Sequence, residues 1–561
     1  MPLKDFSQRS FFDPETISPG ILTPGTLPWM LSQLGESLVP RFLAAEWRGA
    51  GPLGREGWPS RILMDLCLLR WLDGGMSRLG ACNRLKTDLV WRAAAGLPAN
   101  DEAPHEKTVR EFEAWLIERT PSCDLPRYMV VLQRVVHLFE SEAPAERIWM
   151  EDSTPMLCFG ALRGTVRLLG DGLRGLVRRW ARVTRTSAKR LAQDLDVRWL
   201  NARSIKGGLD IDWRDQDARH SVVDRLARDV LRVVGELQSR MYEVAPHHQL
   251  ALHQRCAALL KVIEDDLVGD DCGRLVIAIH KHHDKLDRIV SITDPEARSG
   301  GKSRKQKFKG FKLSVLGDLV SGLIAAVTVV AGNAGDGPPG HELLRRAKAM
   351  GVRIRRLLAD SAYGGTADRL VVSSMGIELV APPQKVQIKK DCALQKHLFD
   401  IDFERERATC PAGVATETHS LVRLNGEQVT QYEWPHATCG ACRLRQDCVP
   451  KLKTGPKKRG QQPKGRRLKL HADEETLRAA RGAWTDPALR QEYRRRGEGE
   501  RLIARMVQFG ARQARAFGLA AANLQAHCVA IAANLALLAK LLADRSAPVR
   551  ADPLPLFQDS G

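Results

Sequence analysis

The stretch R-I-W-M-E-D-S-T-P-M-L, residues 147–157, decides the fold predicted for this chain. Its short apolar run is typical of a β-strand, and it carries two adjacent acidic residues, Glu151 and Asp152. Neighbouring side chains of a strand point to opposite faces of the sheet. Only one of these two carboxylates can therefore face a shared site.

Two further acidic residues stand far along the chain in distinct settings. In VRIRRLLADSAYGG (352–365) an apolar run ends at Asp360, and YRRRGEGERLIARMV (493–507) has helical periodicity and carries Glu500. Carboxylates are ligands that Mg²⁺ prefers, and two such ions about 4 Å apart stabilise both the attacking and the leaving oxygen of a displacement at phosphorus. The three residues predict a phosphoryl-transfer site that holds two Mg²⁺ (or Mn²⁺) ions.

These motifs resemble those of DDE transposases from bacterial insertion sequences. Tyr493, Arg496 and Glu500 have the spacing Y-x2-R-x3-E, L-A-D-S-A-Y-G around Asp360 is similar to the second-Asp motif, and D-S-T-P at Asp152 is similar to the first. The resemblance implies that Asp152, Asp360 and Glu500 are catalytic, rather than Glu151 or Glu498. It also implies that Tyr493 and Arg496 contact DNA beside the cut.

The family pattern continues with a lysine seven residues after the glutamate. This chain has Val507 at that position, and Arg505 or Arg512 could stand in for the lysine. The departure leaves open whether the protein forms a hairpin intermediate.

The order of predicted elements resembles an α/β ribonuclease H-like catalytic core, in which helices flank a mixed sheet. Strands are predicted at 274–280, 287–294, 308–318, 321–333 and 352–360, with a helix at 341–351 before the last. Asp152 and Asp360 would then lie on neighbouring central strands. The predicted units are an N-terminal arm and all-α DNA-binding domain (1–145), a first part of the core (146–390) with a helical insertion at about 161–267, a Cys-rich insertion with a basic loop (391–485), C-terminal core helices (486–545) and a tail (546–561).

Four of the twelve cysteines are grouped in the predicted Cys-rich insertion. Cys410 begins C-P-A-G, and Cys439, Cys442 and Cys448 form C-x2-C-x5-C. Four thiolates in two arms suit a tetrahedral structural Zn²⁺ site, and His436 could replace one of them. The alternative is a set of free thiols or a former site.

The net charge of +20 favours a polyanionic partner, and three basic runs stand out. They are 163–190, 298–312 and 451–469; the last two include Lys305, Lys307, Lys309, Lys457, Lys458 and Arg459 as candidate DNA contacts, to which Arg505 is added. The most apolar stretch, 518–543, contains several polar side chains and is predicted to be a buried helix pair rather than a membrane span.

We therefore expect a cytoplasmic bacterial transposase, associated with the nucleoid, that binds the terminal inverted repeats of an insertion sequence. It would cleave double-stranded DNA and transfer the strand into target DNA, as a homodimer on DNA because two ends must be held together. The alternatives are an inactive transposase-derived DNA-binding protein and a nuclease that cuts without joining.

Overall fold

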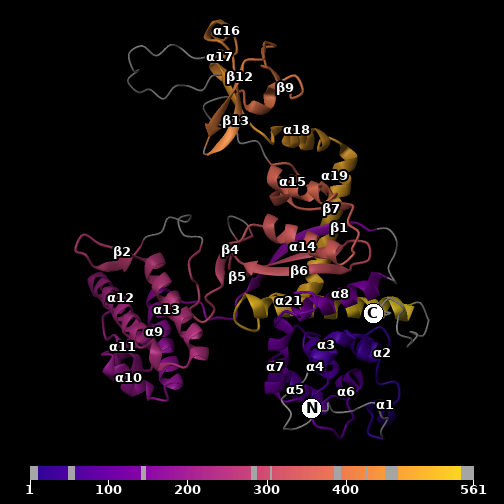
Figure 1. Cartoon of the computed structure of the whole chain (residues 1–561), viewed down its shortest axis with the longest axis vertical. Helices are drawn as coiled ribbons and strands as arrows, with labels where there is room; N and C mark the ends of the chain where they lie inside the picture. Colours follow the sequence, from indigo (N-terminus) through magenta and orange to yellow (C-terminus); the bar gives the residue numbers. More distant parts are fainter. Residues whose placement is uncertain are drawn as a thin grey trace.

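The centre of the protein is a mixed β-sheet (Figure 1). The computed structural model describes residues 11–47, 57–140, 147–278, 287–302, 306–384, 393–424, 426–448 and 465–544. The sheet has the order β4-β5-β1-β7-β8, and β6 also pairs with β5. These strands are β1 (Trp149–Leu157), β4 (Arg298–Gly301), β5 (Lys307–Asp318), β6 (Ile324–Ala331), β7 (Arg356–Leu358) and β8 (Glu378–Val380). β1, β5 and β6 run antiparallel, whereas β7 and β8 run parallel to β1, which is compatible with a ribonuclease H-like core.

Helices cover the sheet and connect its parallel strands. α14 (Gly337–Ala349) packs on β5 and β6 and leads into β7, and α15 (Thr366–Ser374) leads from β7 to β8. Parallel neighbours need such crossover connections, and the apolar faces of both helices are buried on the sheet.

The long helix α21 (Leu519–Asp544) closes the free edge of β6. Asn534 accepts a hydrogen bond from the Ile324 amide (3.0 Å) and donates to the Ile324 carbonyl (2.8 Å), and Asn523 does the same for Val329 (2.9 and 2.9 Å). An uncovered edge strand would leave these backbone groups unpaired. By length and composition α21 could cross a membrane, but 67% of its most apolar stretch is buried within the protein. It is one continuous helix, so the predicted helix pair is wrong.

The N-terminal helices share the core of the sheet through α21 and α8 (Arg127–Glu140). The other helices here are α1 (Pro14–Ile17), α2 (Leu27–Leu34), α3 (Arg41–Glu46), α4 (Ser60–Leu69), α5 (Arg78–Thr87), α6 (Leu89–Ala95) and α7 (Glu106–Ile117). Residues 11–47 do not form a free arm, because Leu27, Met30 and Leu31 of α2 are buried in this core. The helical character predicted for this region is confirmed.

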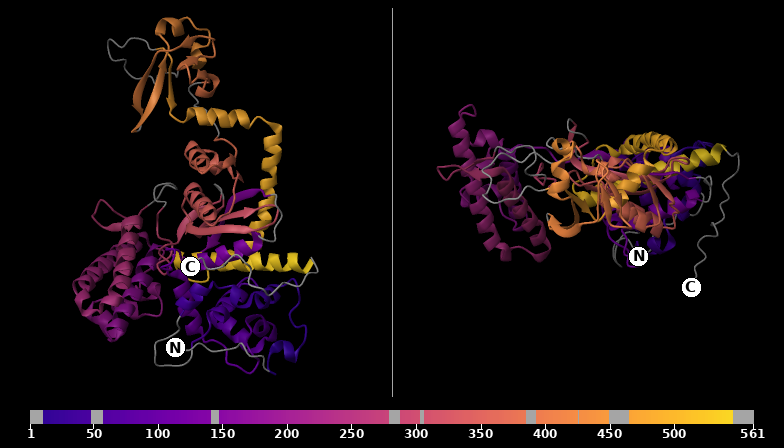
Figure 2. Two further views of the ribbon diagram at one scale, coloured as in Figure 1. Left: turned by 45° about the vertical axis from the view of Figure 1, so that its right-hand side comes forward. Right: turned by 90° about the horizontal axis from the view of Figure 1, so that it is seen from above.

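Between β1 and β4 the chain forms a helical unit with its own core, beside the sheet (Figures 1 and 2). Its main helices are α9 (Thr165–Val183), α10 (Ala188–Asp194), α12 (Gln216–Ser239) and α13 (Pro246–Asp266), with the short α11 (Ile205–Gly208) between them. A hairpin of β2 (Leu267–Gly269) and β3 (Leu275–Ile277) follows.

Two predicted core strands are absent from the central sheet. Residues 275–277 pair with β2 instead, and 287–294 form no strand within the described part of the chain. The second segment is apolar for another reason: Ile289 is buried in the core of the helical unit, and Val290 is buried in the core of the sheet. It is a buried linker between the two.

The cysteine-containing unit lies at the far end of the molecule from the N-terminal helices (Figure 2). Its sheets are β9 (Asp400–Asp402), β10 (Arg407–Thr409) and β11 (Ala415–Thr416), and β12 (His419–Leu424), β13 (Glu427–Glu433) and β14 (Arg467–His471). α18 (Glu474–Ala483) and α19 (Pro487–Arg494) lead the chain back to the sheet, where the 3₁₀ turn η6 (Arg495–Gly499) and α20 (Glu500–Met506) follow.

We predict that Asn534→Ala lowers the free energy of unfolding by about 2–4 kcal/mol, because it leaves a buried N–H and a buried C=O of Ile324 unpaired. Urea unfolding followed by circular dichroism measures this. Asn523→Ala should cost less, because that position is partly exposed and water can replace the side chain. Equal stability of Asn534→Ala and the wild type would contradict the role given to this clamp.

Candidate active site

The two faces of β1 carry different neighbours. On one face Met150 lies against Gly499, and Thr154 accepts a hydrogen bond from Arg512 (3.2 Å). On the other face the Trp149 indole donates to the Arg353 carbonyl (3.1 Å). The period of two in a strand places Asp152 on the first face and Glu151 on the second.

Asp152 and Asp360 occupy equivalent positions in the register of two adjacent parallel strands. β1 pairs with β7 at Trp149–Leu357 and Met150–Leu358, and two more residues in this register bring Asp152 beside Asp360. Asp360 caps the turn that follows β7, where its Oδ1 accepts from the Ala362 amide (2.8 Å). Burial raises the pKa of Asp152, and the negative charge of Asp360 raises it further, against the opposing charge of Arg496.

Arg496 and Tyr493 reach this carboxylate pair from the helix above. The Arg496 guanidinium lies 2.8 Å from Asp152 Oδ1. Burial raises the pKa of Tyr493, and the charges of Asp360 and Asp152 add to this effect while Arg496 opposes it. Tyr493 packs edge-on against Trp484, with ring centroids 5.1 Å apart. The structure therefore brings four of the motif residues together.

Gly499 lets the helix that carries Glu500 lie directly on β1. A Cβ at Gly499 would lie only 1.7 Å from the Met150 sulfur, so no side chain fits there. Glu500 begins α20, directly after the 3₁₀ turn η6 that carries Arg496. The rival Glu498 instead pairs with Arg495 (3.6 Å) and Arg501 (3.2 Å).

The other face of β1 holds a buried acid. Burial raises the pKa of Glu151 well above its usual value, although a hydrogen bond with Tyr363 opposes this. The Tyr363 hydroxyl donates to the Asp336 carbonyl (3.0 Å), and the Ser153 hydroxyl donates to Asp336 Oδ1 (2.9 Å). This network holds β1 to the start of α14, and sequence patterns did not predict it, because its members stand far apart in the chain.

The carboxylate oxygens at this site suit a hard divalent cation such as Mg²⁺, but the three carboxylates are not arranged around one position. Asp152 and Asp360 follow the paired residues of adjacent strands, and both offer the carboxylate oxygens that such a cation prefers. Glu500 is exposed, and among the described residues no group of three or more His, Cys, Asp or Glu is placed to hold a metal ion.

The candidate DNA contacts differ in where the structure places them. Arg505 donates to the Gly322 carbonyl, and burial lowers its pKa to about 10, so it is engaged with the β5–β6 turn. Of the two arginines that could replace the family lysine, Arg512 is the one on the Asp152 face. Lys307 and Lys309 are exposed on one face of β5. Lys305, Lys457, Lys458 and Arg459 lie outside the described residues.

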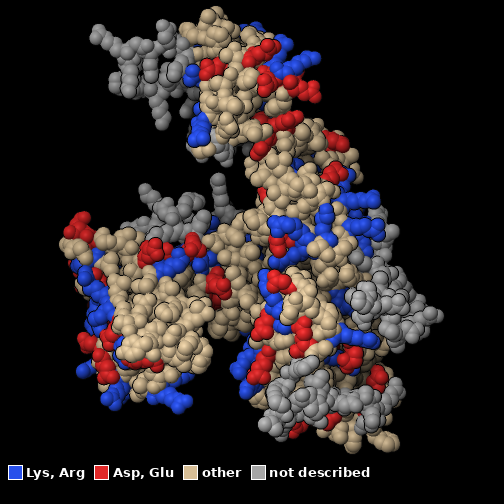
Figure 3. All heavy atoms as spheres, in the orientation of Figure 1, with Lys and Arg blue, Asp and Glu red and all other residues tan. Residues whose placement is uncertain are grey.

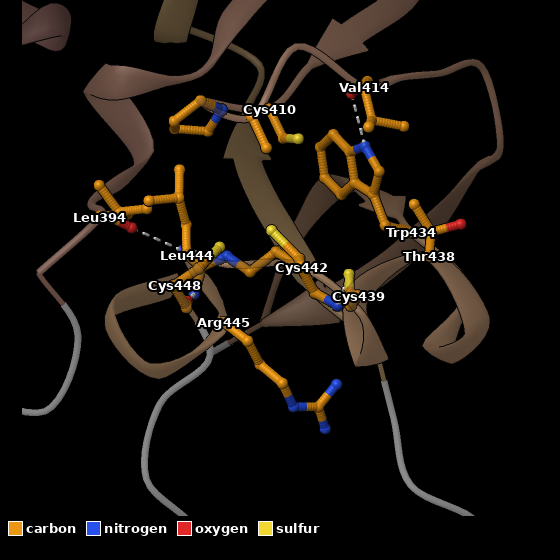
Figure 4. A pocket seen from close by; sticks show the side chains of 13 residues that line it. Leu394, Cys410, Val414, Trp434, Thr438, Cys439, Cys442, Leu444, Arg445 and Cys448 are labelled. Carbon is orange, nitrogen blue, oxygen red and sulfur yellow. Dashed lines mark hydrogen bonds between the residues drawn. The ribbon is translucent and has the colours of Figure 1, made fainter.

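The four grouped cysteines line one pocket. Cys410 lies on one side of it, beside Trp434, and Cys439, Cys442 and Cys448 lie on the other (Figure 4). The Arg466 amide donates to the Cys439 sulfur (3.4 Å). The described thiols share this pocket without forming a group spaced to bind a metal.

The comparison with protein families concerns the second part of this arrangement. Residues 277–535 match the family model described as Transposase DDE domain. The match covers a little under half of the chain and supports its prediction as a DDE transposase of an insertion sequence. The matched region includes Asp360 and Glu500 and begins after Asp152. No curated protein and no solved structure matches significantly.

We predict opposite results for isosteric changes at the two neighbouring acids. Glu151→Gln should keep DNA cleavage and stability near the wild type, because burial raises the pKa of Glu151 and so favours the uncharged form, which an amide resembles. Asp152→Asn should lose cleavage, because an amide cannot supply the negative charge that a divalent cation needs. Cleavage of a labelled DNA substrate and thermal melting measure both. Loss of cleavage in Glu151→Gln with retained folding would contradict the assignment of faces.

Proposed function

We propose that this protein is a transposase that binds the terminal inverted repeats of an insertion sequence and catalyses metal-dependent strand cleavage and strand transfer into target DNA. The observation that carries the proposal is the level placement of Asp152 and Asp360, with the Tyr493–Arg496 helix on the same face. The transposase DDE domain supports the reaction class.

Asp152, Asp360 and Glu500 would hold two Mg²⁺ (or Mn²⁺) ions. When bound, the ions would supply activation of the attacking hydroxyl and charge stabilisation of the leaving oxygen. Glu500 is an exposed side chain on a helix packed on β1, and it would move toward the aspartates when the ions bind.

Arg496 has a distinct role in this proposal. Its guanidinium neutralises Asp152 before the ions and DNA arrive. A guanidinium also pairs well with phosphate, so it would turn to the phosphate beside the cut once cations take over the carboxylate. Tyr493, whose ring is already held by Trp484, would stack on an unpaired base.

The remaining contacts follow from charge and symmetry. The N-terminal helices would read the terminal repeats, and Lys307 and Lys309, with the basic run around them, would contact phosphates. Two transposon ends must be held together, so a homodimer on DNA, in the cytoplasm, is proposed.

One observation favours the alternative of a DNA-binding protein without activity. Glu500 is not gathered with the aspartates among the described residues. Such a protein would bind end DNA but would show neither cleavage nor strand transfer with Mg²⁺ or Mn²⁺. A nuclease that does not join would show cleavage alone.

We predict that Glu500→Gln abolishes cleavage and strand transfer while the affinity for end DNA stays within about twofold, because the basic residues, not the carboxylate, supply phosphate contacts. Glu498→Gln is the matched control, since Glu498 is tied to two arginines on the helix surface. A gel-based cleavage assay and a binding titration separate the two steps. If Glu498→Gln is inactive and Glu500→Gln is active, the helix register proposed here is wrong.

We also propose that Cys410, Cys439, Cys442 and Cys448 bind a structural Zn²⁺. The unit around them has only seven fully buried apolar residues, a small core that a metal can supplement. All four thiols line one pocket, and an amide that donates to Cys439 is the kind of neighbour that orients a metal-bound thiolate. Binding would draw the two arms together.

We predict about one Zn²⁺ per purified chain by elemental analysis, and its loss in Cys439→Ser, because tetrahedral sites need all four ligands. Cys123→Ser is the control, because Cys123 is an exposed cysteine outside the pocket. Folded wild-type protein that is free of zinc and stable to chelators would refute the site.

A further inference from the structure

The helical unit between β1 and β4 carries a surface of uncompensated positive charge. Residues 172–193 of the chain contain seven Lys or Arg and no Asp or Glu, and residues 246–263 also contain no acid. These two segments belong largely to α9 and α13, which pack against each other. Like charges therefore gather where two helices meet.

The contact between the two helices concentrates four arginines. A Cβ on Gly175 of α9 would lie 3.7 Å from Arg255 Nη1, so the guanidinium of α13 lies over this glycine. Arg178, Arg179 and Arg182 are three, four and seven residues after Gly175, so they share its helix face. We call Arg178, Arg179, Arg182 and Arg255 the arginine face. The arginines of this face repel one another. Burial lowers the pKa of Arg255, and the charges of Arg179 and Arg182 lower it further.

Other arginines of the same unit behave differently. On and after α12, Arg228 pairs with Asp224 (2.8 Å), Arg232 with Asp229 (3.2 Å) and Arg240 with Glu243 (2.9 Å). In the part of the chain that the structure describes, no such acidic partner is placed on the arginine face. The unit thus pairs some of its arginines with acidic residues and leaves those of the arginine face without them. Solubility alone does not require such a separation of paired and unpaired arginines. Figure 3 shows Lys and Arg side chains along the lower end of this unit.

We propose that the arginine face binds the phosphate backbone of double-stranded DNA at a place separate from the scissile phosphate. The clustering of four arginines around Gly175, without acids, matches the charge and spacing of a polyanion, since guanidinium groups pair well with phosphate. The face begins at Arg178, about 20 Å along α9 from the residue where this helix begins, at 1.5 Å per residue. The proposed contact therefore lies apart from the sheet that carries Asp152.

The inference rests on the proposed function for the presence of DNA, but its test does not require catalysis. The variant Arg178→Gln, Arg182→Gln, Arg255→Gln is compared, as full-length protein, with the control Arg228→Gln, Arg232→Gln, Arg240→Gln. The affinity for a 40-base-pair duplex is measured by fluorescence anisotropy from 50 to 200 mM salt. Each lost phosphate contact should make the log–log salt slope shallower by about 0.9. The wild type should then lose about 20- to 60-fold more affinity over this range than the arginine-face variant does, while the control should follow the wild type.

Two further measurements keep the outcome decisive. The variant Arg178→Lys, Arg182→Lys, Arg255→Lys keeps the charge and should restore most of the slope; failure to do so in a folded protein would overturn the proposal, because the positive charge alone should keep most phosphate contacts. Vesicles with one fifth phosphatidylserine test the other polyanionic surface. An unchanged slope in the arginine-face variant, an equal change in the control, or an effect on vesicle binding alone would overturn the proposal. Loss of cleavage in the variants with normal salt slopes would concern the catalytic proposal only.

Discussion

The candidate site depends on β1 having a strand partner on each side. Its nine residues pair antiparallel with β5, and its first residues pair parallel with β7. Pairing on both edges fixes the register, and a one-residue slip would exchange the two faces of the strand. Because the β1–β7 register is fixed, Asp152 and Asp360 lie level although 208 residues separate them in the sequence. The helical unit is inserted between β1 and β4 of this sheet, and the family-matched region contains β4 to β8.

Side chains alternate between the two faces of β1, so two consecutive acidic residues lie in different environments. Glu151 is enclosed with Tyr363 near the start of α14, where burial raises its pKa, whereas Asp152 faces Arg496 and the neighbouring aspartate. Arg496 supplies positive charge on the face that carries Asp152. Where the helix approaches β1, Gly499 removes the steric barrier between them. The same strand thus provides a structural acid and a candidate ligand in consecutive positions.

Local sequence patterns predicted the strands and the helix of the site, because short-range hydrophobic periodicity determines these elements. The short apolar runs before Asp152 and Asp360 and the helical spacing of Tyr493, Arg496 and Glu500 correspond to β1, β7 and the helix that packs on β1. Non-local packing could not be predicted. Residues 287–294 have the composition of a strand because they fill two separate cores, and Asn523 and Asn534 stand in an apolar run because each pairs with the backbone of an edge strand 190 or more residues away. The position of Arg255 over Gly175 likewise needs both helices to be in place.

The central claim is that Asp152, Asp360 and Glu500 converge on one divalent cation site when the protein is loaded. Iron-directed protein cleavage tests it most directly: Fe²⁺ replaces Mg²⁺, ascorbate and peroxide generate hydroxyl radicals at the ion, and mass spectrometry locates the cuts in the polypeptide. The account predicts cuts near all three residues in the presence of DNA, each suppressed by excess Mg²⁺. Cuts near Asp152 and Asp360 with none near Glu500, or cuts that Mg²⁺ does not suppress, would contradict it.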